Sequence, residues 1–227
     1  MKIYNCLALS LLMFASCTTT KELTRADNYP AMYSEKPSGI LIMPPINKTV
    51  NVEAKEYFYT SLAKPLCNKG YYVVSPFLAM EILKSESAYD SEMFLEANLA
   101  PFRNVFGAEA ALFTIINNWE KSTIGSKITV NIEYILKSTK NNEIIFNRKG
   151  KVTVDTSINI SEGGLLGSLI SMAASAVNTA ITDKVVAARC CNEHCLYDLP
   201  EGQYSPKFGL DGDIVAGAKE FEAAIQK

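Results

Sequence analysis

Residues 38–76, SGILIMPPINKTVNVEAKEYFYTSLAKPLCNKGYYVVSP, contain the pattern that decides the fold. The stretch begins with a short apolar run, Gly39 to Met43, which two prolines end because proline cannot continue a strand ladder. A second apolar run, Tyr71 to Val74, closes the stretch. The residues between the two runs have helical spacing, so we predict a strand-helix-strand unit. Two buried strands joined in this way lie parallel in one sheet, with a right-handed connection.

The predicted helix has recognisable ends. Asn51 is suited to cap its amino terminus, because Asn side chains accept hydrogen bonds from the unpaired amides there. Gly70 is placed to end the helix, and Pro65 should kink its last turns. Apolar residues recur at every fourth position of this helix, which indicates one buried face. These residues are Ala54, Phe58, Leu62 and Leu66.

The second half of the chain changes from helical to alternating spacing. Ala110 to Trp119 is a predicted strand, and residues 128–137 alternate apolar and polar, as a strand with one buried face does. Residues 144–154 repeat the alternation after Asn141 and Asn142, and because Asn tolerates positive φ the two runs predict a hairpin. With helices over 77–83 and 91–106, these elements predict an α/β (α+β) domain whose mixed sheet has about five strands.

The last third of the chain has no such alternation. Residues 163–182 carry no charge and are as long as a membrane-spanning helix, but their Gly, Ser and Thr content is costly in lipid. We therefore favour a helix packed on the sheet and running to Ala188, with membrane insertion or oligomer formation as the alternatives. Residues 196–213 contain Pro and Gly and predict an irregular segment. A short final helix is predicted from the spacing of Ile214, Ala218, Phe221 and Ile225.

The first sixteen residues are expected to be a leader. Lys2 precedes an apolar run at residues 7–14, and small residues follow it, as at a site of signal-peptide cleavage. The sequence Phe14-Ala15-Ser16-Cys17 resembles the bacterial lipobox, in which cleavage precedes a cysteine that carries a diacylglycerol. A secretory signal with an incidental cysteine is the alternative.

The expected domain organisation follows from this leader. Residues 1–16 are the signal peptide, Cys17 carries the lipid, residues 17–37 form a tether, and residues 38–227 form one domain. Thr18, rather than Asp, follows the lipidated cysteine, which by the usual sorting rule favours the outer membrane, with the domain facing the periplasm.

Four further cysteines are candidates for disulfides in an oxidising compartment, and they are Cys67, Cys190, Cys191 and Cys195. Sequence leaves three pairings open. We favour a bond within the short turn that ends at Cys195, with a second bond to Cys67. His194, the single histidine, makes zinc the alternative, but structural zinc sites usually draw ligands from two separated pairs. We therefore expect no metal site, and a catalytic pair of cysteine and histidine would lack an orienting acid.

Composition excludes some partners. The net charge of −2 and the absence of a basic stripe give no footprint for binding nucleic acid. Gly163 and Gly164 belong to no dinucleotide-binding or P-loop motif, so we expect no cofactor.

Several segments resemble one known family, namely residues 40–47, the helix Glu56 to Leu66, the strand Gly70 to Val74, the late Leu199-Pro200 turn and the lipobox cysteine. They are similar to an uncharacterised bacterial lipoprotein family first noticed as a meningococcal surface-antigen candidate. The resemblance implies a fold like the amino-terminal domain of TolB and the ABC-transport auxiliary lipoproteins. It also implies an accessory role in envelope transport or secretion. The cysteine cluster at 190–195 has no counterpart in the pattern.

The leading functional hypothesis is a non-enzymatic outer-membrane lipoprotein that binds protein partners in an envelope transport or secretion assembly. The alternative is a periplasmic module that binds a small molecule or an envelope lipid, in a pocket lined by Phe94, Phe102 or Phe106. A thiol-dependent enzyme using His194 and Cys195 is the third hypothesis.

Overall fold

One mixed sheet organises the computed structural model, which describes residues 22–122, 127–156 and 176–226. Within these residues the strands are β1 (Gly39–Ile42), β2 (Ile46–Asn47), β3 (Tyr72–Val73), β4 (Ala110–Lys121), β5 (Lys127–Ser138), β6 (Ile144–Asp155) and β7 (Glu220–Gln226). The helices are α1 (Arg25–Asn28), α2 (Pro30–Glu35), α3 (Ala54–Ser61), α4 (Ala63–Asn68), α5 (Pro76–Ser85), η1 (Ser91–Phe94), α6 (Ala100–Phe106) and α8 (Ala176–Leu196).

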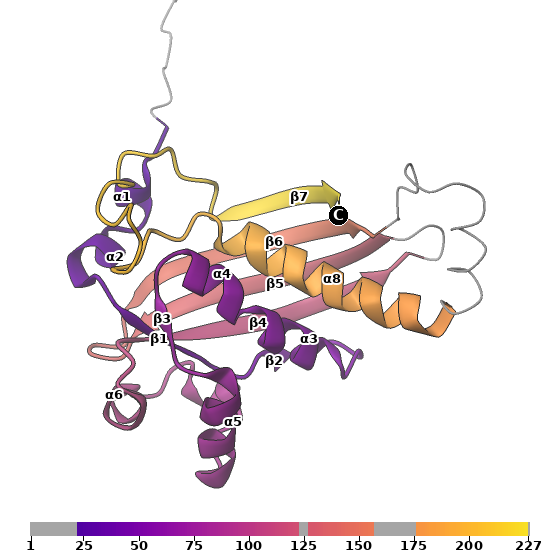
Figure 1. Ribbon diagram of the computed structural model, residues 1–227, viewed down its shortest axis with the longest axis horizontal. Coiled ribbons are helices and arrows are strands. Elements are labelled where there is room, and N and C mark those ends of the chain that lie inside the picture. The colour runs from indigo at the N-terminus through magenta and orange to yellow at the C-terminus, as the bar shows by residue number, and fades with distance from the viewer. Residues whose placement is uncertain (1–21, 123–126, 157–175, 227) are drawn as a thin grey trace, which may run out of the picture.

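The strands lie in the order β3-β1-β4-β5-β6-β7, and β2 also pairs with β4 (Figure 1). β1 is parallel to both β3 and β4, while β4, β5 and β6 form an antiparallel meander. β7 pairs with β6 in parallel, so that Lys149 lies opposite Glu220. The mixed α/β fold predicted from the sequence is confirmed, with seven strands in the described residues in place of about five.

The strand-helix-strand unit is present as predicted, with its helix divided in two. Pro65 has no N–H to donate to the Ser61 carbonyl, and the helix is interrupted at Leu62, between α3 and α4. Gly70 ends α4 with a φ of 78°. Asn51 is not the amino-terminal cap, because that position is Glu53, which makes no side-chain capping bond.

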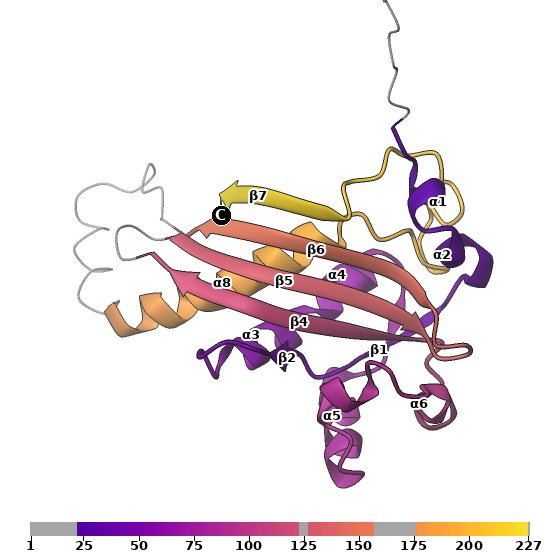
Figure 2. The same ribbon diagram turned by 180° about the vertical axis from the view of Figure 1, so that it is seen from behind.

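Helices cover the two faces of the sheet unequally. α3, α4 and α8 pack on one face over the larger core, which includes Phe58, Leu66, Ile132 and Tyr134. α5 and α6 cover only the β1 and β4 end of the other face, around a smaller core that contains Phe113. Figure 2 shows the remaining part of this second face, across β4 to β7, with no described helix in front of it.

A buried amide joins α8 to both layers. Asn192 accepts a hydrogen bond of 2.5 Å from the Tyr134 hydroxyl on β5. Its amide nitrogen donates to the Phe58 carbonyl at 3.1 Å and to the Ser61 hydroxyl at 2.8 Å, both on α3. All the polar groups of this side chain are therefore satisfied inside the core, which makes the position of α8 specific.

The final helix predicted from residues 214–225 is wrong, because residues 220–226 form β7. Phe221 and Ile225 are four residues apart, and an even spacing places side chains on one face of a strand as well as of a helix. Both side chains pack against the larger core. The spacing alone could not distinguish the two structures.

The predicted tether is wrong from residue 22 onward. Residues 25–28 and 30–35 form α1 and α2, and Tyr29 and Met32 are buried in the larger core. The folded domain therefore begins near Thr24 rather than at residue 38. Short helices of this kind escape detection because one turn is too short to show a period.

Some expectations fall on residues that the structure does not describe. The leader over 1–16, Cys17 and most of the uncharged stretch 163–182 are among them. The described part of α8, which contacts α3, β5 and β6, packs on the sheet. Among the described helices, none combines the length and the apolar character that crossing a bilayer requires.

The turn at Gly70 gives a test of the fold. A Cβ at Gly70 would lie 2.3 Å from the backbone nitrogen of Ser205, whereas a Cβ at Gly209, which also has positive φ, would meet nothing within 4 Å. We expect Gly209→Ala to cost about 1 kcal/mol of unfolding free energy through φ alone. Gly70→Ala should cost about 3 kcal/mol, because the clash adds to the φ penalty. Urea unfolding measures both, and equal losses would contradict the close contact with the Ser205 segment.

Candidate functional site

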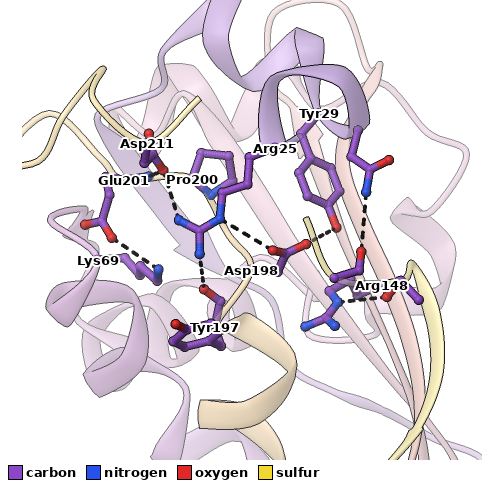
Figure 3. A network of polar contacts seen from close by, with 12 residues as sticks. Arg25, Tyr29, Lys69, Arg148, Tyr197, Asp198, Pro200, Glu201 and Asp211 are labelled. Carbon is purple, nitrogen blue, oxygen red and sulfur yellow. Dashed lines mark hydrogen bonds and ion pairs between the residues drawn. The ribbon is translucent and has the colours of Figure 1, made fainter. Parts of the chain in front are cut away.

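A buried network of charged groups joins the first residues of the domain to the irregular segment 197–218 (Figure 3). Its centre is Arg25, which is only 3% exposed. The guanidinium Nε lies 3.4 Å from Asp198 Oδ1, and Nη1 lies 3.2 Å from Asp211 Oδ2. Nη2 donates to the Tyr197 carbonyl at 3.2 Å. One side chain of α1 thus holds three positions more than 170 residues away in the sequence.

The backbone directs Arg25 inward. Thr24 caps α1 in a capping box. Its side chain accepts the Asp27 N–H, and the Asp27 side chain accepts the Thr24 N–H. Thr24 also forms an antiparallel bridge with Val215, so that the Arg25 N–H donates to the Ile214 carbonyl at 2.8 Å. A cap on one side and a strand-like pairing on the other leave the Arg25 side chain facing the core.

Both carboxylates of the network have further partners. Asp198 Oδ2 accepts a 2.9 Å hydrogen bond from the Tyr29 hydroxyl, and Asp211 Oδ2 accepts the Glu201 N–H at 2.9 Å. Burial, together with the nearby Asp198 carboxylate, raises the pKa of Tyr29 well above its ordinary value, so that the phenol stays a donor. Buried charges of this kind are tolerated when each is paired and hydrogen-bonded.

A second arginine ties the network to the sheet. Arg148 on β6 donates to the last carbonyls of α8, with Nη1 3.0 Å from the Cys195 oxygen and 3.3 Å from the His194 oxygen. A cation here complements the negative end of the helix dipole. The Nε of Arg148 donates to the Ala218 carbonyl at 3.3 Å, and its guanidinium lies 4.3 Å from the centre of the Phe221 ring. Arg148 therefore holds α8, the 197–218 segment and β7 together.

An ion pair extends the network to the turn after α4. Lys69 Nζ lies 3.2 Å from Glu201 Oε1, and both side chains are mostly buried. Burial lowers the pKa of Lys69. The Lys69 and Gly70 carbonyls also accept N–H groups of Gly202 and Tyr204. The 197–218 segment is thus bonded on one side to α1 and on the other to the strand-helix-strand unit.

The uncovered face of the sheet has a shallow polar hollow of about 410 Å³. It is lined by Asn117, Asn131, Glu133, Lys149, Gly150, Lys151, Glu220 and Phe221. The Asn131 side-chain oxygen is buried here and has no hydrogen-bond partner. A buried polar atom without a partner costs free energy, which an incoming donor would recover.

A second hollow is apolar and lies between α5 and α6. Its volume is about 370 Å³, and its walls include Leu83, Phe94, Phe102, Val105 and Phe106. The Phe94 and Phe102 rings are 5.0 Å apart in an edge-to-face arrangement. The three phenylalanines named from the sequence as pocket candidates are therefore brought together.

The cysteines lie differently from the prediction. Cys190, Cys191 and Cys195 belong to the last turns of α8 rather than to a loop, and Cys67 is exposed on α4. No two described cysteines lie at disulfide distance, so the disulfide predicted among these four residues is not supported. Cys191 and Cys195 share one face of α8, but Cβ atoms four residues apart on a helix are about 5 to 6 Å apart, farther than the roughly 4 Å that a disulfide needs.

The local environment also argues against thiol chemistry. Burial raises the pKa of Cys195 to about 12, and it raises that of Cys191 as well. These thiols stay protonated, whereas the thiolate is the nucleophile and the metal ligand. The ring centres of His194 and Phe221 are 5.3 Å apart. Burial, and to a smaller extent the nearby Arg148 charge, lowers the pKa of His194. Over the described ranges, no three metal-binding side chains come together.

Sequence reasoning missed the charged network. Arg25 lay in a segment read as a tether, and Asp198 and Asp211 lay in a segment read as irregular. A charge that pairs across most of the chain leaves no local pattern. The only available signal was that charged residues stand beside aromatic residues in both segments.

The chain belongs to a family of bacterial lipoproteins. The family model described as "Putative lipoprotein GNA1162-like" matches residues 27–199, which is most of the chain. This match confirms the resemblance found in the sequence and places the protein among lipid-anchored components of the bacterial cell envelope. The matched range begins within α1 and ends just after Asp198, so Tyr29 and Asp198 of the network lie inside it, while Arg25, Glu201 and Asp211 lie outside.

The relatives are distant. A curated protein of Neisseria meningitidis serogroup B, "Putative lipoprotein NMB1124/NMB1162", is 25% identical over 159 residues, which cover 69% of this chain and 73% of the relative. The crystal structure of lipoprotein GNA1162 from N. meningitidis is 23% identical, covers 63% of this chain and 99% of that one, and has a TM-score of 0.48.

Two further solved structures show a weaker likeness. The LpoB carboxy-terminal domain from Escherichia coli is 19% identical, with a TM-score of 0.35, over 55% of this chain and 95% of that one. The PelC dodecamer from Paraburkholderia phytofirmans is 12% identical, with a TM-score of 0.39, over 71% and 87%.

The buried network can be tested by removing its central charge. Arg25→Gln leaves Asp198 and Asp211 buried without their cation, which should cost about 3 to 5 kcal/mol of unfolding free energy. The matched control is Lys64→Gln, because Lys64 pairs with Glu193 at 3.5 Å on the surface. That variant should lose less than about 1 kcal/mol. Urea unfolding at neutral pH compares the two, and a small, equal loss in both would contradict the structural role of Arg25.

Proposed function

We propose that this lipoprotein is a non-catalytic accessory component of an envelope transport or secretion assembly, and that it binds protein partners through the uncovered face of its sheet. Cys17 carries the lipid anchor in this proposal, and the outer membrane, on its periplasmic side, is the expected location. The observation that carries the proposal is the polar hollow with its buried, unpartnered Asn131 oxygen.

The hollow is suited to a protein surface rather than to a small ligand. It is open and polar, and its charges alternate in sign, with Glu133 on β5, Lys149 and Lys151 on β6 and Glu220 on β7. Alternating charges select partners by complementarity more than they add affinity. Strands β5 and β6 are long and paired along their whole length, so they hold these side chains at fixed positions.

The family supports the setting of this proposal. A lipoprotein is held at a membrane by its lipid, so a partner gains effective concentration from tethering without a large interface. A modest polar face is enough under these conditions. The buried, protonated thiols argue against the thiol-dependent enzyme that we considered as a third hypothesis.

Charge reversal on the hollow tests the proposed binding face. In solubilised envelopes, we expect the unchanged protein to capture a partner protein by cross-linking. The double variant Lys149→Glu, Lys151→Glu should no longer capture it. Both lysines are exposed, and the ion pair of Lys151 with Glu222 lies at the surface, so its loss should cost less than about 1 kcal/mol of unfolding free energy. Lys140→Glu, on the exposed turn between β5 and β6, is the control and should keep the partner. Capture of the same partner by all three proteins would contradict the proposed binding face.

The apolar hollow between α5 and α6 favours a second candidate function, the binding of a small apolar molecule or an envelope lipid acyl chain. Its volume of about 370 Å³ and its phenylalanine walls are those of a small ligand pocket. Native mass spectrometry of protein purified in mild detergent checks this function. A spectrum of bare protein alone would remove it.

A further inference from the structure

Exposed apolar side chains gather at the end of the domain where the chain enters the fold. Leu23 is 54% exposed and Leu210 is 77% exposed, and the large side chains of Ile214 and Val215 are about half exposed. These four residues define what we call the anchor-end surface. Figure 1 shows the 197–218 segment wrapped along α1 and α2 at this end of the molecule.

The anchor-end surface is held in place by backbone hydrogen bonds. The Ala216 N–H donates to the Leu23 carbonyl at 2.8 Å, and Thr24 bridges Val215. The Ala26 N–H donates to the Gly212 carbonyl at 3.0 Å, two residues after Leu210. Arg25 then pairs with Asp211 beneath this surface. The exposed side chains are therefore part of a rigid structure rather than of a loose loop.

The length of chain before the domain limits what can cover this surface. Cys17 and Leu23 are six residues apart, so even a fully extended chain joins them over roughly 20 Å. If residues 17–37 were a tether, the same extended spacing would let the domain lie roughly 70 Å from the lipid. With the lipid at Cys17, the anchor-end surface cannot move far from the headgroup layer.

Other side chains nearby fit a membrane interface. Tyr204 and Phe208 are exposed on the same segment, and aromatic side chains favour the headgroup level of a bilayer. Lys36 lies 6.0 Å from the Phe208 ring, and Lys207 is exposed beside it. Lysines at this depth extend their ammonium groups toward lipid phosphates. Asp213, an exposed acid on the segment, would have to stay on the water side.

We propose that the anchor-end surface lies on the membrane to which Cys17 is attached, with Leu23, Leu210, Ile214 and Val215 in contact with the lipid interface. This inference rests on the proposed anchoring through Cys17. It gives the domain one orientation, because the lipid and the surface form two attachments at one end. A diacylglycerol on Cys17 already gives stable binding, so the added apolar contacts act mainly by orienting the domain.

Tryptophan fluorescence in vesicles tests the orientation. The lipidated chain would be purified from bacterial membranes and placed in vesicles of phosphatidylethanolamine and phosphatidylglycerol with brominated acyl chains. Leu210→Trp reports on the anchor-end surface, and Phe77→Trp is the control. Phe77 is 73% exposed on α5, which projects below the sheet and away from α1 in both views (Figures 1 and 2). The natural Trp119 is 7% exposed and gives a constant background.

The expected result is a blue shift and loss of emission for Leu210→Trp in brominated vesicles, with neither change for Phe77→Trp. Emission of Leu210→Trp at the wavelength of exposed tryptophan, in a chain that floats with the vesicles, would overturn the inference and leave the anchor intact. A blue shift without bromine quenching would also overturn it, because a second copy or another protein would then cover the surface. If the chain and its Cys17→Ala variant both fail to float, the anchoring proposal itself is wrong.

Discussion

The pairing of Arg25 with Asp198 and Asp211 is the interaction on which the arrangement of the chain ends depends. A guanidinium buried to this degree is costly unless carboxylates surround it, and the two carboxylates are equally costly without their cation. The side chains of Arg25, Asp198 and Asp211 are therefore stable either buried together in the folded protein or solvated together in the unfolded chain. As a result, the first turn of the domain and the 197–218 segment fold as one unit.

This unit determines the rest of the last third of the chain. The 197–218 segment connects α8 to β7, and Arg148 binds carbonyls at the end of α8 and just before β7. β7 can pair with β6 in parallel because α8 carries the chain back along the length of the sheet, and the segment then turns the chain into β7 at the α1 and α2 end (Figure 1). A segment without regular secondary structure thus adds the seventh strand, while its ion pairs supply the rigidity that helices or strands supply elsewhere.

The sequence predicted the elements whose signal is local. The strands around Ile132 and Val152 show a period of two, the helix at Phe58 shows a period near four, and Gly70 ends that helix. β7 was missed because Phe221 and Ile225 satisfy both periods. Its partner strand, which would have decided the question, lies about seventy residues earlier in the chain.

The site was less predictable than the fold for a physical reason. Disulfides were expected because exported proteins often have them, but the cysteines lie on a helix whose backbone and core contacts determine where the thiols point. The buried ion pairs join residues that are far apart in the sequence, and no periodic pattern records such a contact. Asn131 was likewise unremarkable as one polar residue of an alternating strand, until the structure showed its oxygen buried without a partner.

The central claim is that residues 24–35 are an integral part of the domain and not a tether. Hydrogen exchange of the full chain tests this claim most directly, at the Arg25, Ala26 and Ala216 amides that bond across the two segments. The account predicts that these amides exchange as slowly as those in the middle of β5. Exchange at the rate of an unstructured peptide, with β5 still protected, would contradict it.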